Sequence, residues 1–253
     1  MLSFSSSGVR IAYVDIPCDG ANTPIVLVHG FASSHMVNWQ NTNWVRTLGE
    51  AGFRVIALDN RGHGQSEKLY DPEAYSSDEM ARDVLNLLDH LDIGEADVMG
   101  YSMGARVTAH LALMAPDRVR SALSGGLGIH LIEGVGLPLG IADAMEAASL
   151  EDLTDPTQRM FRAFAEQNKQ DLKALAACIR GSRQTLTREL VSTISMPVLV
   201  SVGTRDAIAG DPHALAHLIP KGEAFDIPGR DHNLAVGDRA HKEAVTSFLA
   251  RRP

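Results

Sequence analysis

The sequence predicts an α/β fold, in which a mostly parallel sheet is covered by helices on both faces. Short apolar, β-branched runs alternate with segments of helical periodicity along most of the chain. With right-handed crossovers, such an alternation brings the strands side by side into one sheet. The 253 residues, 45% of them hydrophobic, are enough for one large domain with a substantial core.

The first half of the chain contains six of the expected strands, and the first two of them turn at Ser7-Gly8. The run Ile25-Val26-Leu27-Val28 is apolar at every position, which is typical of a central parallel strand buried on both faces. The helix expected over 77–91 has one apolar stripe and a capping signal, Ser76 or Ser77 followed by Glu79. The expected strands here are 2–4, 9–16, 25–28, 54–58, 97–101 and 119–123, and the helices are 39–51, 77–91 and 105–114.

Residues 127–196 interrupt the alternation, because they contain several helical stretches and no convincing strand. About seventy residues are too many for an ordinary connection, so this segment is expected to be an inserted subdomain. The core is then formed by residues 1–126 and 197–253. Helices are expected at 140–148, 157–169, 171–179 and 185–193 in the insertion; strands 197–202 and 223–227 and helices 211–218 and 239–249 follow it.

The composition excludes several classes of protein. A formal net charge of −8 argues against nucleic acid or an anionic membrane as the main partner. Only two cysteines occur, Cys18 and Cys178, which fits a reducing compartment without a disulfide framework. The N-terminus lacks the features of a secretory signal, and no apolar run reaches the length of a membrane span. We expect a soluble cytoplasmic protein, with its oligomeric state left open.

The most informative stretch is Gly100-Tyr101-Ser102-Met103-Gly104, which follows an apolar strand directly and opens a helix. A serine on a tight strand-to-helix turn tolerates only very small residues two positions before and after it. That turn lifts the hydroxyl above the sheet edge and points the N-terminus of the helix at the group it attacks. The five-residue pattern alone is weak evidence, so the function depends on what else the chain supplies.

In an open parallel sheet, ligands bind at the carboxyl ends of the strands. A serine, an acid and a histidine all emerge at that edge, in the chain order Ser, Asp, His. The residues at these strand ends are His29-Gly30-Phe31, Asp59, Ser102, Gly203-Thr204-Arg205-Asp206 and Pro228-Gly229-Arg230-Asp231-His232.

These residue types fit nucleophilic catalysis. A serine hydroxyl is a poor nucleophile until an imidazole takes its proton, and the imidazole needs a carboxylate to fix its tautomer. We assign these three roles to Ser102, His232 and Asp206. The negative charge of a tetrahedral intermediate needs backbone N–H donors, for which Phe31 and Met103 are the expected pair.

Two other acids compete with Asp206. Asp211 is better explained as the N-cap of the following helix, with Pro212 at its first position. Asp231 adjoins His232, a geometry that rarely lets a carboxylate orient the neighbouring ring. His35 and His130 are both candidates for lining a pocket, but neither is expected to be catalytic. No two histidines show a ligand-like spacing with a third ligand nearby, and no nucleotide signature surrounds the serine, so neither metal nor cofactor is expected.

Together these motifs resemble the α/β-hydrolase family. The resemblance covers essentially the whole chain outside the insertion and implies an eight-stranded sheet with a helical cap, residues 127–196, inserted after strand six. It supports the roles of the three side chains and two backbone donors named above. It also implies that His29 is structural and that the turn with Arg61 and His63 mainly fixes loop geometry. The motifs are His29-Gly30-Phe31, Asp59-x-Arg61-Gly62-x-Gly64-x-Ser66, Gly100-x-Ser102-x-Gly104, Gly203-x-x-Asp206 and Asp231-His232.

The expected activity is that of a serine hydrolase of the carboxylesterase type, acting through an acyl-enzyme on small to medium hydrophobic esters. A serine at this place argues against haloalkane dehalogenase and epoxide hydrolase, whose family members use aspartate there. Lactonase, carbon–carbon bond hydrolase, amidase, acyltransferase and perhydrolase chemistry remain open, as does a slow-turnover small-molecule receptor. The stretches 126–132 and 135–139, rich in glycine and aliphatic residues, either form an apolar lip over the serine or pack the cap onto the core.

Overall fold

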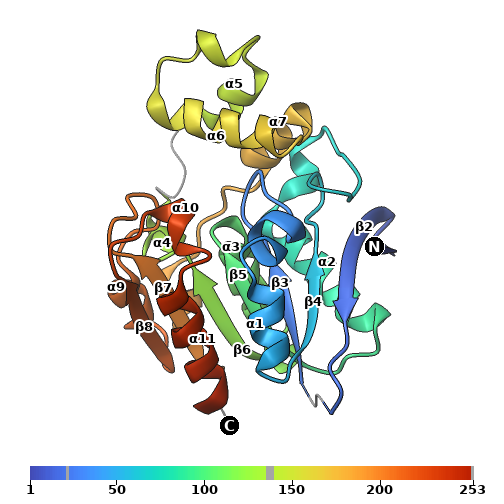
Figure 1. The fold of residues 1–253 in the computed structure, drawn as a ribbon, viewed down its shortest axis with the longest axis vertical. Coiled ribbons are helices and arrows are strands. Elements are labelled where there is room, and N and C mark those ends of the chain that lie inside the picture. The colour runs from blue at the N-terminus through green and yellow to red at the C-terminus, as the bar shows by residue number, and fades with distance from the viewer. Residues whose placement is uncertain (21–22, 135–139, 252–253) are drawn as a thin grey trace.

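The sheet has eight strands in the order β1-β2-β4-β3-β5-β6-β7-β8 (Figure 1). The computed structural model describes residues 1–20, 23–134 and 140–251. Strand β1 pairs antiparallel with β2, and β2 pairs antiparallel with β4, whereas all pairs from β4 to β8 are parallel. This arrangement confirms the predicted fold class. The strands are β1 (Leu2–Ser6), β2 (Val9–Ile16), β3 (Pro24–Val28), β4 (Arg54–Leu58), β5 (Ala96–Tyr101), β6 (Val119–Gly125), β7 (Val198–Gly203) and β8 (Gly222–Ile227).

Helices cover both faces of the sheet, and further helices form the insertion. The helices of the core are α1 (Trp44–Glu50), α2 (Ser77–His90), α3 (Met103–Met114), α9 (Pro212–Ala216), α10 (His232–Ala235) and α11 (Arg239–Arg251). The insertion contains α4 (His130–Glu133), α5 (Ile141–Glu146), α6 (Pro156–Gln167), α7 (Leu172–Gly181) and α8 (Arg188–Val191). Single turns occur at η1 (Met36–Gln40), η2 (Pro72–Tyr75), η3 (Pro116–Arg118) and η4 (Leu150–Asp152).

The alternation of side chains along the strands divides the core into two apolar clusters. In β3, Ile25 and Leu27 point to one face and join a cluster with residues of α1 and α11. The intervening Val26 and Val28 point to the other face, where α2 and α3 pack. The central strands are therefore buried on both faces, as the continuously apolar run predicts.

Local hydrogen bonding explains where several helices begin. The helix expected over 39–51 starts only at Trp44, because Asn43 adopts a left-handed conformation with φ 63°. For α2 the N-cap is Ser76 rather than Ser77, since its Oγ accepts from the N–H of Glu79 at 3.1 Å. The helix expected over 185–193 shortens to α8, where the Thr187 side chain caps the first turn. The one-turn helices α4 and α10 were not expected, because four residues are too few to show a period.

Helices α5, α6 and α7 of the insertion lie beyond one edge of the sheet, at the top of Figure 1. This is the edge where the parallel strands end, since Phe161 of α6 contacts Phe31 with ring centroids 6.1 Å apart. Further along the same edge, the hydroxyl of Tyr70 donates to Asp171 at 2.9 Å. In the part of the chain that the structure describes, no helix has the length and apolar character needed to cross a membrane.

The turn between β5 and α3 is closely packed at its two glycines. Ser102 sits at the turn itself with φ 55° and ψ −113°, a region that residues other than glycine rarely adopt. A Cβ on Gly104 would lie 2.0 Å from the carbonyl oxygen of Val28, and one on Gly100 would lie 2.1 Å from that of Gly104. The expectation that only very small residues fit around the serine is therefore confirmed.

Replacing Gly104 by Ala should destabilise the fold, because the new methyl group meets backbone atoms of β3 that cannot move aside. We expect the free energy of unfolding to fall by at least about 2 kcal/mol, measured by urea denaturation. Gly94→Ala is the matched control, because nothing lies within 4 Å of the added Cβ there. Equal stability of the two variants would contradict this account of the turn.

Candidate functional site

Ser102 lies where β5 ends and α3 begins, with its side chain at the carboxyl edge of the sheet. Its backbone N–H donates to the carbonyl oxygen of Gly125 at 2.7 Å, which fixes the turn against β6. Met103 is the first residue of α3, so the positive end of that helix faces the serine. The serine is half-buried while its neighbours on both sides are buried.

The structure brings the three predicted side chains into one hydrogen-bonded chain. The Nε2 atom of His232 lies 3.0 Å from the Oγ of Ser102. Its Nδ1 lies 2.7 Å from a carboxylate oxygen of Asp206, whose side chain is fully buried. Because a carboxylate accepts, the proton of the neutral ring lies on Nδ1, and Nε2 is left as an acceptor for the serine hydroxyl.

The loops that carry the acid and the histidine hold both in place. The second carboxylate oxygen of Asp206 accepts from the N–H groups of Ile208 at 2.8 Å and Ala209 at 3.1 Å. The hydroxyl of Tyr101, the residue before the serine, donates to the carbonyl oxygen of His232. The site therefore depends on backbone contacts as well as on side chains.

Neither competing acid orients the histidine ring. Asp211 caps α9 by accepting from the N–H groups of His213 and Ala214, as expected. Asp231 caps α10 by accepting from the N–H groups of Asn233 and Leu234. Both carboxylates have helix-capping roles, whereas Asp206 faces His232.

The backbone N–H groups of Phe31 and Met103 donate to no acceptor among the described residues. Gly30 brings the first of them close to the serine, since an added Cβ on Gly30 would lie 3.4 Å from that of Ser102. The Oδ1 atom of Asn38 accepts from the N–H of Gly30 at 2.8 Å and so fixes this turn. Two free donors therefore flank the hydroxyl.

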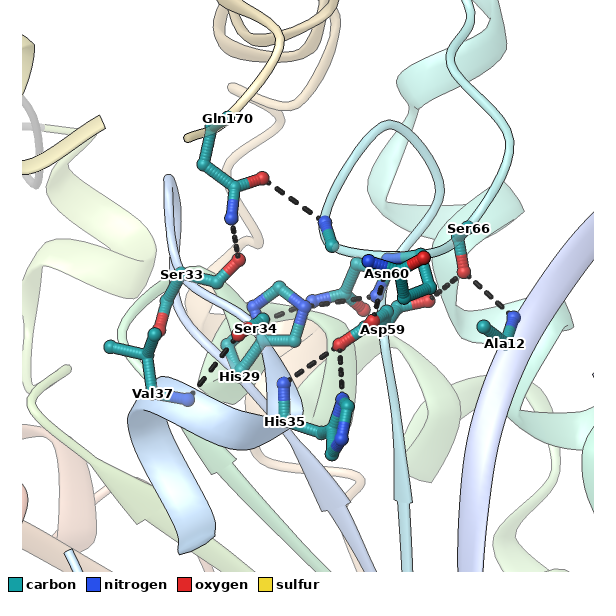
Figure 2. Close-up of polar contacts among 12 residues, drawn as sticks. Ala12, His29, Ser33, Ser34, His35, Val37, Asp59, Asn60, Ser66 and Gln170 are labelled. Carbon is teal, nitrogen blue, oxygen red and sulfur yellow. Dashed lines mark hydrogen bonds and ion pairs between the residues drawn. The ribbon is translucent and has the colours of Figure 1, made fainter. Parts of the chain in front are cut away.

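A polar network lies behind this turn, at the ends of β3 and β4 (Figure 2). One carboxylate oxygen of Asp59 accepts from the backbone and the ring of His35, both at 2.8 Å, and the other accepts from the N–H of Gln65. Burial opposes ionisation of Asp59, but these contacts and nearby His29 bring its pKa down to about 2. Asp59 therefore remains ionised and ties two loops together.

The turn that follows Asp59 is fixed by contacts within it and to α2. Arg61 forms a buried, bidentate pair with Asp83 at 2.7 and 2.8 Å. The ring of His63 bonds to the carbonyl oxygen of Arg61 through Nδ1 at 3.0 Å. Arg61 thus ties the turn to α2, and His63 contacts the turn through Nδ1 while its buried Nε2 has no partner among the described residues. The buried pair of Arg61 agrees with the structural role that the family resemblance implies.

Two buried histidines of this region are neutral at physiological pH. Burial lowers the pKa of His29 to about 4 and that of His63 to about 3. His29 donates from Nδ1 to the carbonyl oxygen of Gly30 and accepts from the N–H of Asn60 at Nε2, as Figure 2 shows in part. A neutral ring satisfies both contacts, so His29 supports the turn rather than the chemistry.

Two cavities meet at Ser102. The larger, of about 210 Å³, is mainly apolar and also includes His232 in its wall. The smaller, of about 50 Å³, extends toward α3 and α7. Among the described residues, Ser102 is the one that lines both.

Only some of the residues that the sequence offers as pocket candidates line a cavity in the structure. Leu127 and Leu131 both belong to the main apolar cluster, and Leu127 also lines the smaller cavity, so the stretch 126–132 both lines the site and packs. The stretch 135–139 lies outside the described residues. His35 bonds to Asp59, and His130 bonds through Nδ1 to the carbonyl oxygen of Ile208 at 2.7 Å. Neither of these histidines lines the two cavities.

Sequence reasoning missed Asn38 and Arg106. The partner of Asn38 is a backbone N–H, which no side-chain pattern shows. Arg106 had a visible signal, because it is the one charged residue in the apolar helix α3. Within the described residues, no group of three metal-ligating side chains is arranged to hold an ion.

Comparison with known proteins agrees with the fold. The model of the α/β-hydrolase fold family matches residues 23–133. The enol-lactonase from Burkholderia xenovorans LB400 superposes with a TM-score of 0.80, over 99% of this chain and 100% of the other, at 22% identity. The chain therefore has the α/β-hydrolase fold.

Two curated relatives show how far sequence similarity extends. The dihydrolipoyllysine-residue acetyltransferase component of the acetoin cleaving system of Pseudomonas putida is 35% identical over 83% of this chain. Epoxide hydrolase B of Mycobacterium tuberculosis is 38% identical over 52% of it. The chain spans 58% of the first relative's length and 36% of the second's.

The buried histidines make the stability depend on pH. Their pKa values lie below the ordinary 6.5 in the fold, so the unfolded chain binds more protons as the pH falls from 6.5 toward 4. We expect the free energy of unfolding to fall by at least about 2 kcal/mol between pH 7 and pH 5, measured by urea denaturation. His63→Leu should reduce this dependence. A free energy of unfolding that stays constant or rises over that interval would contradict the assignment of neutral buried rings.

Proposed function

We propose that this protein is a serine hydrolase that cleaves carboxylic esters of small to medium hydrophobic substrates through an acyl-enzyme. The observation that carries the proposal is the hydrogen-bonded chain of Ser102, His232 and Asp206 at the meeting point of two cavities. We further propose that residues 127–196 act as the cap that shapes the substrate site.

In the first half-reaction, Ser102 attacks the ester carbonyl while the Nε2 of His232 takes its proton. Asp206 accepts from the opposite ring nitrogen and stabilises the imidazolium that forms. The histidine then returns the proton to the departing alcohol. Water cleaves the acyl-enzyme in the second half-reaction, with His232 again as the base.

The tetrahedral intermediates carry a negative charge on the former carbonyl oxygen. The free N–H groups of Phe31 and Met103, together with the N-terminus of α3, are the groups we assign to bind it. Asn38 contributes indirectly as a positioning residue, because it fixes the turn that carries the Phe31 N–H.

The larger cavity favours an apolar substrate group of modest size. Its wall includes aromatic and aliphatic side chains from the core and from α6, with a few polar groups. A volume of about 210 Å³ accommodates a short or medium chain but not a long one. A lactone presents the same carbonyl chemistry in cyclic form and is within the proposed class. The residues of the wall include Phe31, Val37, Asn38, Met160, Phe161, Phe164 and Val236.

The similarity to an epoxide hydrolase does not carry that activity to this chain. An epoxide opened by a carboxylate gives an ester, which water can hydrolyse at its carbonyl. An epoxide opened by Ser102 would give an ether, which has no carbonyl for water to attack. The serine therefore favours acyl transfer over epoxide hydrolysis.

Replacing Ser102 by Ala removes the nucleophile while leaving the packing of the turn intact. We expect kcat/KM for 4-nitrophenyl butyrate to fall at least about 10⁴-fold, with an unchanged circular dichroism spectrum. A variant that turns over this ester at the original rate would rule out Ser102 as the nucleophile.

Matched substitutions of Asp206 and Asp211 should show which carboxylate supports catalysis. Asp206→Asn keeps the shape of the side chain but loses the charge that stabilises the imidazolium, so kcat should fall by about 10²- to 10⁴-fold. Asp211→Asn is the control, because that carboxylate only caps α9. The assignment fails if the two variants have the same kcat on 4-nitrophenyl butyrate.

A further inference from the structure

Arg106 is an unusual residue for its position, because α3 is otherwise apolar or neutral and packs into the core. Arg106 lies one helical turn after Ser102 and is only 9% exposed to solvent. Arg106 lines the smaller cavity, together with Ser102 and Met103. A cation is therefore held beside the nucleophile.

The partners of Arg106 leave its charge uncompensated. Its Nη atoms donate to three backbone carbonyl oxygens, those of Gln184 at 2.6 Å and of His130 and Leu131 at 3.3 Å. No carboxylate of the described residues forms an ion pair with it, and none provides an acceptor for its Nε. By contrast, the other two buried arginines, Arg61 and Arg162, each have an acidic partner.

Among the described residues that line the smaller cavity, the charged ones are both basic, Arg106 and Arg183. Burial, reinforced by Arg183, lowers the pKa of Arg106 to about 10, which leaves it cationic at neutral pH. Arg183 lines the same cavity, and no acidic residue does so among the described lining residues. The chain as a whole has a net charge of −8, so this positive cavity is opposite in sign to the protein.

A buried cation without a counter-ion is costly, and an anion that enters the cavity reduces that cost. The planar fork of a guanidinium matches a carboxylate. The volume of about 50 Å³ is that of one or two water molecules, enough for a carboxylate but not for a long chain.

We propose that the smaller cavity binds a carboxylate carried by the substrate, so that the preferred substrates are esters or lactones with a free acid group near the scissile carbonyl. This proposal rests on the proposed function, because it assigns the substrate class of the same site. The larger cavity then holds the apolar part of the substrate, and Ser102 attacks where the two cavities meet.

Binding can be tested without catalysis. In the Ser102→Ala variant, calorimetry with glutarate should detect binding, and the additional Arg106→Met substitution should raise the Kd about 10- to 100-fold. Equal Kd values with and without Arg106, or no binding of glutarate at all, would overturn the proposal. Binding of inorganic phosphate with no binding of glutarate would overturn it as well.

A second experiment measures whether the enzyme prefers an ester with a free carboxylate over a neutral one. Mono-4-nitrophenyl glutarate is compared with 4-nitrophenyl 5-methylhexanoate, in which an uncharged isopropyl group replaces the carboxylate. We expect the ratio of kcat/KM values to favour the acid, and Arg106→Met to reduce this ratio about 10- to 100-fold. A ratio that Arg106→Met leaves unchanged would contradict the assignment.

Two control variants distinguish the loss of the positive charge at Arg106 from a general structural effect of the substitution. Arg106→Met also removes the contacts to three carbonyl oxygens, but a general loss of activity cancels in the ratio, and Arg106→Lys should restore part of the preference. Arg180→Met makes the same change of net charge on the exposed side of α7, where Arg180 pairs with Glu146, and should leave the ratio unchanged. If Ser102→Ala retained activity, the proposed function would fail, whereas glutarate binding tests the anion site separately.

Discussion

The position of Ser102 depends on the contact between α3 and the central strands, which leaves no space for a side chain at Gly100 or Gly104. That contact forces the serine into a conformation that costs about 1–3 kcal/mol at a residue with a side chain. The packing of α3 against β5 and β6 offsets this cost. The strain is local and places the hydroxyl at the sheet edge with the helix N-terminus behind it.

The surrounding loops are held mainly by bonds between side chains and backbone. Asp59 fixes the end of β4, Asn38 fixes the turn after β3, and Asp206 organises the loop after β7 while it faces His232. Each of these side chains has a partner on a different loop or strand end. The geometry of the site is therefore held by the fold itself, as the proposed stabilisation of a transition state requires.

The sequence predicts the eight strands and the meeting of three polar side chains at the sheet edge because both depend on simple rules. Apolar runs identify buried strands, and the ends of parallel strands must meet at one edge, so Ser102, Asp206 and His232 come together without further information. The start of α1 was not predictable, because Asn43 breaks the helix through a left-handed conformation that its sequence does not require. Asn38 and Gln170 were missed for a related reason: their partners are backbone groups, and those of Gln170 are more than a hundred positions away.

Gln170 joins the insertion to two loops of the core, since its amide donates to the carbonyl oxygen of Ser33 and accepts from the N–H of Gly64 (Figure 2). The main apolar cluster likewise includes Leu175 and Ile179 of the insertion beside Val26 of the sheet. The insertion is distinct from the core along the sequence, but the two are packed together in the structure. The insertion and the core share one network of contacts, so unfolding either one exposes apolar surface of the other. We therefore expect heat or urea to unfold them as a single cooperative unit.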